Sequence, residues 1–390
     1  MLSYDLTARD GTPLYEYLYR CIRDDIHRGV LSAGEKLPSR RSLAAHLGIS
    51  VITVDNAYAQ LLSEGYIQAE ARRGYFVSAA LRTVPASTQP VPAERTPQPA
   101  ERVWLADFVS NETRAEQFPF ALWSRLIREL LSAEQETLLK NPPPGGRLDL
   151  RQAIAAHLLS FRGLRVDPEQ IIIGAGTEYL YGLLVQLLGM DRVYAVEEPG
   201  YRKAASVYMS HGARCVPIPM DAAGLRAELL PASGASVAHV SPSHHFPTGR
   251  VMSAGRRAEL LDWAAAGDRY IIEDDYDSEF RLVGLPIPAL QSIDRAGRVI
   301  YMNTFTKTLA STIRISYMVL PEALLRQYRA KLSFYACTVS SIEQATLAAF
   351  ISRGFFEKHL NRTRSSCRRK RDRLLAGIQS RLPSGLATVS

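Results

Sequence analysis

The sequence has little cysteine and no long apolar run. Its four cysteines (Cys21, Cys215, Cys337 and Cys367) are far apart and form no C-x-x-C pair. This spacing excludes a disulfide framework and a thiolate metal site, and it favours reduced thiols. No stretch of about 18 apolar residues occurs, and the N-terminus lacks the basic and apolar regions of a signal peptide. We therefore expect a cytoplasmic protein that binds no metal and enters no membrane.

The first 80 residues also lack a surplus of positive charge. The chain carries a net charge of +8, but this segment holds nine basic and nine acidic side chains. Much of the excess lies in the segment 353–381 instead. Any nucleic-acid contact by the N-terminal segment must therefore be argued from motifs and local placement, because the overall charge does not support it.

Composition divides the 390 residues into two domains and a linker. The stretch 83–101 contains five prolines and no aliphatic cluster, so it cannot bury a core and is typical of a semi-extended linker. We expect a small domain at 1–80, a linker at 81–103 and a large domain at 104–390. In the large domain, short β-type runs alternate with helical segments, which predicts an α/β fold with a mostly parallel sheet and helices on both faces. The six expected strands are 170–173, 192–197, 237–240, 270–273, 298–303 and 317–320.

The N-terminal segment has the pattern of a winged helix-turn-helix. A helix is expected from residue 14 to 28, and Ser39 and Ser50 are placed to cap two short helices separated by a turn at Gly48. The second of these helices, residues 51–64, is the one that enters the DNA major groove in this geometry. The residues 65–67 and 72–77 then predict a two-stranded wing with a basic tip.

The string GEKLPSRRSLAAHLGISVITVDNAYAQLLSEGYI, residues 34–67, closely resembles the GntR-type winged helix. The resemblance implies that five residues face double-stranded DNA: Arg40, Arg41, Thr53, Arg73 and Gly74. Family members usually carry Arg-Asn after the turn serine, whereas Val51 and Ile52 stand here. We expect base reading at that point to use apolar contact, for example with thymine methyl groups. A winged helix that only mediates protein contacts is the alternative.

The large domain offers every part of a pyridoxal 5′-phosphate (PLP) site. Lys307 follows the strand 298–303 and can form an imine once it is desolvated. Asp274 ends the strand 270–273, where a carboxylate can hold a pyridine nitrogen, and Tyr276 can reach the ring oxygen. The Gly-rich turn 174–177 opens a helix, so its N–H groups suit a phosphate. Arg314 and Thr304 can complete that cradle.

These segments resemble the fold-type I aminotransferase half of the MocR family, in which a GntR-type reader precedes an aminotransferase-like domain. The matching motifs are EPGY at 198–201, SPSHHFPTG at 241–249, EDDYDSEF at 273–280 and TKTL at 306–309. The resemblance implies that Lys307 carries the cofactor, that Asp274 holds the pyridine nitrogen and that Tyr276 neighbours O3′. It assigns the phosphate to Gly176, Thr177, Thr304 and Arg314, and a stacking role to Tyr201. Either His244 or His245 takes the place near O3′ where aminotransferases have an asparagine.

The sequence departs from the aminotransferase pattern in ways that bear on catalysis. Ser311 replaces a proline, Ser316 replaces a glycine, and the stretch 141–146 lacks the tyrosine that aminotransferases lend to the neighbouring subunit's phosphate. The sequence ends at Ser390, so the C-terminal small domain is incomplete relative to the family, and the resemblance implies roughly 70–90 further residues. The arginine that grips a substrate carboxylate normally lies there. The sequence is then a fragment or has lost that arginine, and we expect negligible transamination by this chain.

We interpret the chain as a PLP-dependent transcriptional regulator whose large domain senses PLP, an amine or an amino acid. It would act as a homodimer on a double-stranded DNA operator, as an activator or a repressor. An aminotransferase with an appended DNA-binding domain is the alternative, and a plain GntR repressor with a cofactor-free dimerisation domain is a third hypothesis. The basic segment 362–373 is interpreted as a solvated or subunit-facing helix face, with a second DNA contact as its alternative.

Overall fold

A computed structural model describes residues 2–79, 113, 115–280 and 288–381. Contacts between Cα atoms divide the chain into two compact units, Met1–Leu105 and Ala106–Ser390. The expected linker at 81–103 lies outside the described residues. In the part of the chain that is described, no helix is long and apolar enough to cross a membrane.

The N-terminal unit has the helix-turn-helix and wing that the sequence predicts. Its elements are η1 (Leu6–Ala8), α1 (Leu14–His27), α2 (Arg40–Leu47), α3 (Val51–Ser63), β1 (Ile67–Glu70) and β2 (Gly74–Val77). Both serine caps are confirmed, because Ser39 Oγ accepts the N–H of Ser42 at 3.2 Å and Ser50 Oγ accepts that of Thr53 at 3.1 Å. Gly48 ends α2 with a φ of +67°, a left-handed conformation that suits glycine.

The helices of this unit pack on one apolar core. Leu18 and Ile22 of α1 and Val54, Tyr58 and Leu61 of α3 are fully buried in it. The phenol of Tyr58 also donates to the carbonyl of Pro38 at 3.0 Å, which fixes the approach to α2. The same helix α3 therefore anchors the unit through one face and leaves the start of its other face exposed.

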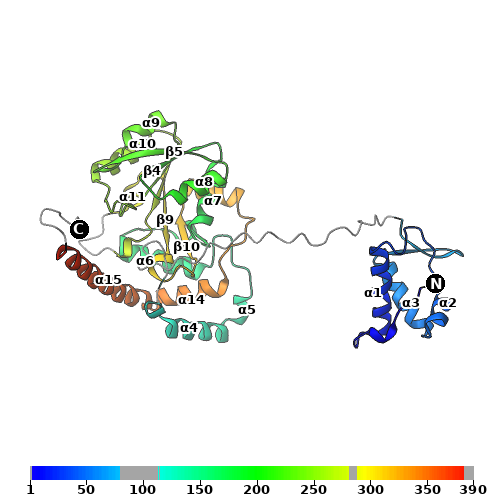
Figure 1. Cartoon of the computed structure of the whole chain (residues 1–390). Coiled ribbons are helices and arrows are strands. Elements are labelled where there is room, and N and C mark those ends of the chain that lie inside the picture. The colour runs from blue at the N-terminus through cyan, green and yellow to red at the C-terminus, as the bar shows by residue number, and fades with distance from the viewer. Residues whose placement is uncertain (1, 80–112, 114, 281–287, 382–390) are drawn as a thin grey trace. The chain divides into compact units, whose positions relative to one another are not determined.

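The large unit is built on an eight-stranded mixed sheet (Figure 1). Its strands are β3 (Ile171–Gly174), β4 (Val193–Glu198), β5 (Arg214–Asp221), β6 (Gly224–Leu225), β7 (Val237–Val240), β8 (Tyr270–Asp274), β9 (Val299–Thr304) and β10 (Ser316–Val319), in the order β3-β10-β9-β8-β7-β4-β5-β6. The five strands from β9 to β5 are mutually parallel, and β10 is antiparallel to both of its neighbours. The expected mostly parallel sheet is confirmed.

Helices cover both faces of this sheet. They are α4 (Phe120–Ala133), α5 (Gln135–Leu138), α6 (Leu148–Arg162), α7 (Thr177–Leu188), α8 (Arg202–Ser210), α9 (Leu230–Ser233), α10 (Ala254–Ala265), α11 (Leu290–Ile293), α12 (Phe305–Thr308), α13 (Glu322–Lys331), α14 (Ser341–Ser352) and α15 (Phe355–Gln379). Four short 3₁₀ segments, η2 (Ala115–Gln117), η3 (Pro168–Gln170), η4 (Ala227–Leu229) and η5 (Ser278–Phe280), connect them. Helices α4, α6, α14 and α15 share one core layer, and α7, α8 and α13 share the other.

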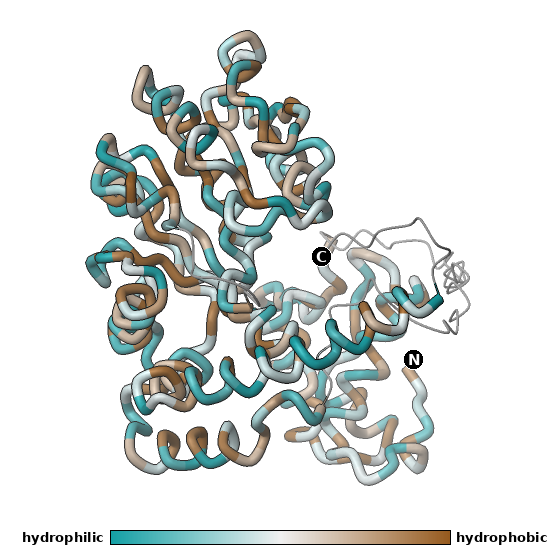
Figure 2. The backbone as a smooth tube through the Cα atoms, turned by 90° about the vertical axis from the view of Figure 1, so that its left-hand side faces the viewer, coloured by the Kyte–Doolittle hydropathy of each residue, from teal (hydrophilic) through white to brown (hydrophobic). Residues whose placement is uncertain are grey.

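Alternate residues of the central strand β9 enter opposite layers. Tyr301 packs in the layer of α4, α6, α14 and α15, whereas Ile300 and Met302 pack in the layer of α7, α8 and α13. Because both faces are covered, the strands are apolar at nearly every position rather than at every second one. Figure 2 shows this as brown stretches through the middle of the unit.

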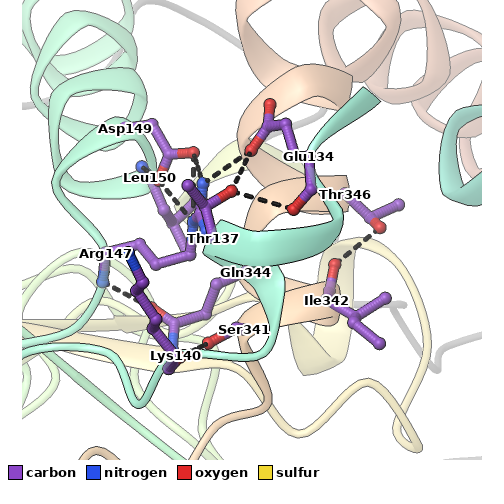
Figure 3. Close-up of polar contacts among 10 residues, drawn as sticks. All are labelled: Glu134, Thr137, Lys140, Arg147, Asp149, Leu150, Ser341, Ile342, Gln344 and Thr346. Carbon is purple, nitrogen blue, oxygen red and sulfur yellow. Dashed lines mark hydrogen bonds and ion pairs between the residues drawn. The ribbon is translucent and has the colours of Figure 1, made fainter. Parts of the chain in front are cut away.

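Helix α14 holds the stretch 141–147, which is rich in proline and glycine, through hydrogen bonds at both of its ends (Figure 3). Gln344 Oε1 accepts the N–H of Arg147 at 2.7 Å, and Ser341 Oγ donates to the carbonyl of Lys140 at 3.0 Å. Gly146 has a φ of +94°, and a Cβ there would lie 2.8 Å from Gln344 Oε1. Only glycine fits this turn, which delivers the chain into α6.

Sequence reasoning missed two strands, β5 and β6. Strand β5 contains Pro217 and Pro219 and is only partly buried, so it lacks the continuous apolar run that identifies the other strands. Strand β6 has two residues and pairs with the end of β5. The remaining six strands occur at their expected places with ends shifted by one residue at most.

Candidate functional site

The candidate cofactor site lies at the carboxyl ends of the parallel strands, where ligands of open α/β sheets bind. Lys307 lies in α12, directly after β9. Partial burial lowers the pKa of the Lys307 ammonium, and the charge of Asp277 acts in the opposite direction. A lowered pKa raises the fraction of neutral amine, which is the form that attacks a carbonyl.

The turn carrying Lys307 and the glycine turn meet across Ser316. In the sheet register, Ser316 of β10 pairs with Thr304 of β9 on one side and with Gly174 of β3 on the other. The Ser316 hydroxyl donates to Thr304 Oγ1 at 2.7 Å. The serine that departs from the family's glycine therefore binds the residue that caps α12.

The glycine turn forms a narrow cradle with Arg314. Gly176 caps α7 with a φ of +93°, and a Cβ there would lie 2.8 Å from Arg314 Cζ. Arg314 itself has a φ of +52°, and its guanidinium donates to the carbonyl of Ala175 at 3.4 Å. The N-terminal N–H groups of α7, beginning at Thr177, supply the partial positive charge that suits a phosphate.

Asp274, the last residue of β8, is buried and half-satisfied. Its Oδ2 accepts the hydroxyl of Tyr181 at 2.6 Å, and His239 Nε2 lies 3.5 Å from the same oxygen. Its Oδ1 is buried with no hydrogen-bond partner among the described residues. A buried carboxylate oxygen without a donor costs free energy, so this atom fits the N–H of a pyridinium ring.

The two histidines of the 241–249 loop point to different surroundings. His244 stacks on Tyr276 with ring centroids 6.3 Å apart, and its Nδ1 lies 2.7 Å from Asp277 Oδ2. His245 is buried, with Nδ1 2.8 Å from Thr248 Oγ1 and Nε2 3.5 Å from Glu197. Of the two histidines, His244 is thus the one whose ring stacks on Tyr276, an expected cofactor residue.

Tyr201 and Thr304 differ in exposure and in hydrogen bonding. Tyr201 caps α8 and is 46% exposed, so its ring is open to a ligand. Thr304 is buried, and its Oγ1 accepts the N–H of Thr306 at 3.1 Å besides the bond from Ser316. The Thr304 hydroxyl is therefore occupied with shaping the lysine turn.

Beneath the site, a buried ion pair braces two loops. Arg162 Nη2 lies 3.1 Å from Asp275 Oδ2, with side chains 2% and 1% exposed, and it donates to Ser243 Oγ at 3.0 Å. Tyr301 also donates to Asp275 at 2.7 Å. Because Asp275 and Ser243 are each next to a candidate site residue, Arg162 holds the end of β8 and the histidine loop together.

Several residues around the site escaped sequence reasoning. Tyr181 lies one helical turn after Thr177, a spacing that places both on one side of α7. Glu178 pairs with Arg314 at 2.7 Å and also with Lys203 of α8. Arg162 ends α6 more than a hundred residues before its partner, so no local pattern identifies it.

The candidate DNA-reading surface is the start of α3. Val51 and Ile52 are 45% and 73% exposed. The Thr53 hydroxyl lies 2.8 Å from Ser50 Oγ and is thus part of the cap. The exposed side chains of Val51 and Ile52 favour apolar contact with a partner at this position.

The flanking arginines differ in their pairing. Arg40 forms an ion pair with Asp55, and Arg73 forms one with Glu70 and lies over the ring of Phe76. Arg41 is exposed and forms no ion pair with the described residues. Gly74 begins β2 with a φ of +112°, which allows the tight wing turn.

Two protein families match this chain. The model described as "Bacterial regulatory proteins, gntR family" matches residues 14–77, and the one described as "Aminotransferase class I and II" matches residues 107–389. The first match covers the helix-turn-helix and wing. The second covers the mixed sheet and the candidate cofactor site.

Full-length relatives share both parts. The HTH-type transcriptional regulator YdeL of Bacillus subtilis is 40% identical, and the match covers 95% of this chain and 80% of YdeL. The probable rhizopine catabolism regulatory protein MocR of Rhizobium meliloti is 35% identical over 93% of this chain and 76% of its own length. The pyridoxine biosynthesis regulator PdxR of Corynebacterium glutamicum is 31% identical, and the match covers 95% of this chain and 80% of PdxR.

Solved aminotransferases share the fold of the large unit. The kynurenine aminotransferase of Pyrococcus horikoshii, solved in complex with PMP, is 26% identical with a TM-score of 0.63, covering 71% of this chain and 70% of that one. An archaeal alanine:glyoxylate aminotransferase is 28% identical with a TM-score of 0.64, covering 70% of each chain.

Proposed function

This chain belongs to the MocR-type transcriptional regulators, in which a GntR winged helix precedes an aminotransferase-like domain, and we propose that its large unit binds PLP and couples that binding to DNA affinity. The observation that carries the proposal is the buried Asp274 Oδ1 without a donor. A ring N–H would satisfy it, and a charge-assisted bond of this kind contributes about 1.5–3 kcal/mol.

The chain's own residues divide the work of holding the cofactor. The Tyr181 hydroxyl fixes the orientation of Asp274, and Lys307 provides the amine for covalent attachment. Gly176, Thr177 and Arg314 would hold the phosphate, with Thr304 shaping the lysine turn behind them. Tyr276 and Tyr201 would contact the ring. When bound, PLP supplies an electrophilic carbonyl that condenses with amines.

That chemistry suits a sensor. Lys307 in α12 would hold the cofactor, and an amine or amino acid bound in its place would leave the Lys307 amine free in that turn. Helix α15 reaches this turn, because His359 Nε2 lies 2.8 Å from the carbonyl of Thr308. A change at Lys307 can thus be transmitted to a long helix at the surface of the unit.

Operator binding would use the start of α3 and the wing, with Arg40, Arg41, Thr53, Arg73 and Gly74 facing the DNA. We infer a homodimer, because a winged helix binds tightly when two copies occupy two half-sites. Leu139 and Phe334 of the large unit are 88% and 76% exposed and offer apolar area for a second copy. A protein that binds an operator acts in the cytoplasm.

Catalytic turnover is the alternative, because related folds include aminotransferases. We propose that any half-transamination is residual and that the regulatory role dominates. Incubation with an amino donor and a keto-acid acceptor distinguishes the two. Many turnovers per protein molecule would favour the enzyme.

The cofactor site is tested by borohydride reduction of the PLP-treated full chain, followed by mass mapping. We expect the label on Lys307 and its loss in Lys307→Ala, together with the visible absorbance. Lys331→Ala removes an exposed lysine of α13 and serves as the matched control. A label on another lysine would refute the assignment.

A further inference from the structure

Glu178 pairs with two cationic side chains at the proposed phosphate cradle. Its Oε2 accepts from Arg314 Nη2 at 2.7 Å, and its Oε1 forms an ion pair with Lys203 Nζ. Hydrogen bonds from Lys203, and then from Arg314, lower the pKa of the Glu178 carboxyl, which is therefore charged at neutral pH. Both cationic side chains at the start of α7, Arg314 and Lys203, already bind this carboxylate.

We propose that Glu178 is a built-in competitor of the cofactor's phosphate and thereby sets the affinity of the regulator for PLP. The inference rests on the proposed function, since it deepens the description of the same site. A phosphate entering the cradle would have to share or displace the Glu178 carboxylate from Arg314 and Lys203.

The charges indicate that Glu178 opposes phosphate binding and does not assist it. With Glu178 present, the three side chains together carry one positive charge, and without it they would carry two. Like charges a few ångströms apart near a protein surface repel one another, and salt screens them only in part at that distance. A carboxylate beside a phosphate dianion therefore costs binding free energy.

The geometry allows the Glu178 side chain to move away from Arg314 and Lys203. Its side chain is 33% exposed, and those of Arg314 and Lys203 are 46% and 55% exposed, so none is locked in the core. Arg314 keeps its position against Gly176 and its bond to the Ala175 carbonyl, neither of which involves Glu178. Removing the carboxylate should leave the arginine in the cradle.

The test compares Glu178→Gln with wild type in the full-length protein, freed of cofactor by dialysis. The dissociation constants of PLP, from its absorbance change, and of inorganic phosphate, from thermal shift, are both measured. Glu228→Gln is the matched control, because Glu228 is also a carboxylate paired with an arginine, Arg226 at 2.7 Å. We expect Glu178→Gln to bind PLP and phosphate about tenfold more tightly and Glu228→Gln to match wild type.

Two results would overturn the proposal. Equal affinities in Glu178→Gln and Glu228→Gln would show that the carboxylate does not compete, and weaker binding in Glu178→Gln would make it a support for Arg314. The phosphate measurement separates this inference from the proposed function. Tighter phosphate binding in Glu178→Gln, without PLP attachment in wild type, would support the role of Glu178 and refute the cofactor.

Discussion

The Tyr181 hydroxyl donates to Oδ2 of Asp274 at 2.6 Å, while Oδ1 of the same carboxylate is buried without a donor among the described residues. One oxygen is thus used to orient the group and the other is left for a ligand. The sequence predicts Asp274 at a strand end, and Tyr181 of helix α7 is the residue that orients its carboxylate.

We predict that Asp274→Ala weakens PLP binding by about 10- to 150-fold, the equivalent of a lost charge-assisted hydrogen bond. Titration of the cofactor-free protein with PLP measures the change. Asp262→Ala removes an exposed acid of α10 and should have no effect. An unchanged affinity in Asp274→Ala would show that another group holds the ring. Asp275 is already bound by Arg162 and Tyr301.

Replacing Arg162 by methionine should destabilise the large unit by about 3–5 kcal/mol, because it leaves the buried charge of Asp275 unpaired. Urea unfolding followed by the fluorescence of Trp123 and Trp263 reports on this unit. The double variant Arg162→Met/Asp275→Leu removes both charges and should recover much of the loss. If the single variant unfolds like wild type, the pair does not brace the site.

Glu197 should make stability fall as the pH rises. Burial raises the pKa of Glu197 to about 8, whereas in an unfolded chain the pKa of a glutamate is about 4.3. Between these values the folded state binds more protons than the unfolded state, so the free energy of unfolding decreases with pH, by at most about 1.4 kcal/mol per pH unit from this group.

Urea unfolding at several pH values between 5 and 8 tests this for wild type and Glu197→Gln. The variant should lose part of the decrease and be the more stable protein at the upper end. Glu228→Gln, which alters an exposed carboxylate, should follow wild type. Parallel curves for wild type and Glu197→Gln would contradict the raised pKa.

On DNA, Arg41→Ala and Ile52→Ala should act differently. Arg41 is exposed without an ion pair to the described residues, so its loss should weaken specific and non-specific binding together and flatten the salt slope by about one unit. Ile52 is 73% exposed and uncharged, so its loss should weaken specific binding alone. Arg20→Ala, in a pair with Glu16 on α1, is the control. Equal salt slopes for Arg41→Ala and wild type would remove α2 from the interface.

Local patterns predict much of the fold, and they are also the source of the candidate site residues. Ser39 and Ser50 predict the starts of their helices, because serine is a favoured N-cap residue. Apolar runs predict the strands that end at Asp274 and Thr304. The sequence pattern does not predict strand β5, because its prolines interrupt the apolar run.

The partners of those residues could not be predicted, because the contacts join distant segments. Tyr181 meets Asp274 across 93 positions, and Arg314 meets Glu178 across 136. Nothing near Glu178 in the sequence indicates which cations the sheet brings to it. The sequence therefore predicts candidate site residues, and only the fold reveals which side chains contact and pair with them.

The most direct test measures the affinity of the full chain for a DNA fragment selected from its own genome by binding to the purified protein. The dissociation constant is determined without PLP, with PLP, and with PLP plus a mixture of amino acids, for wild type and Lys307→Ala. We predict a change of about 5- to 150-fold in wild type, typical of coupled sites, and none in Lys307→Ala. A wild-type protein that carries PLP on Lys307 yet binds the fragment equally under all three conditions would contradict the account.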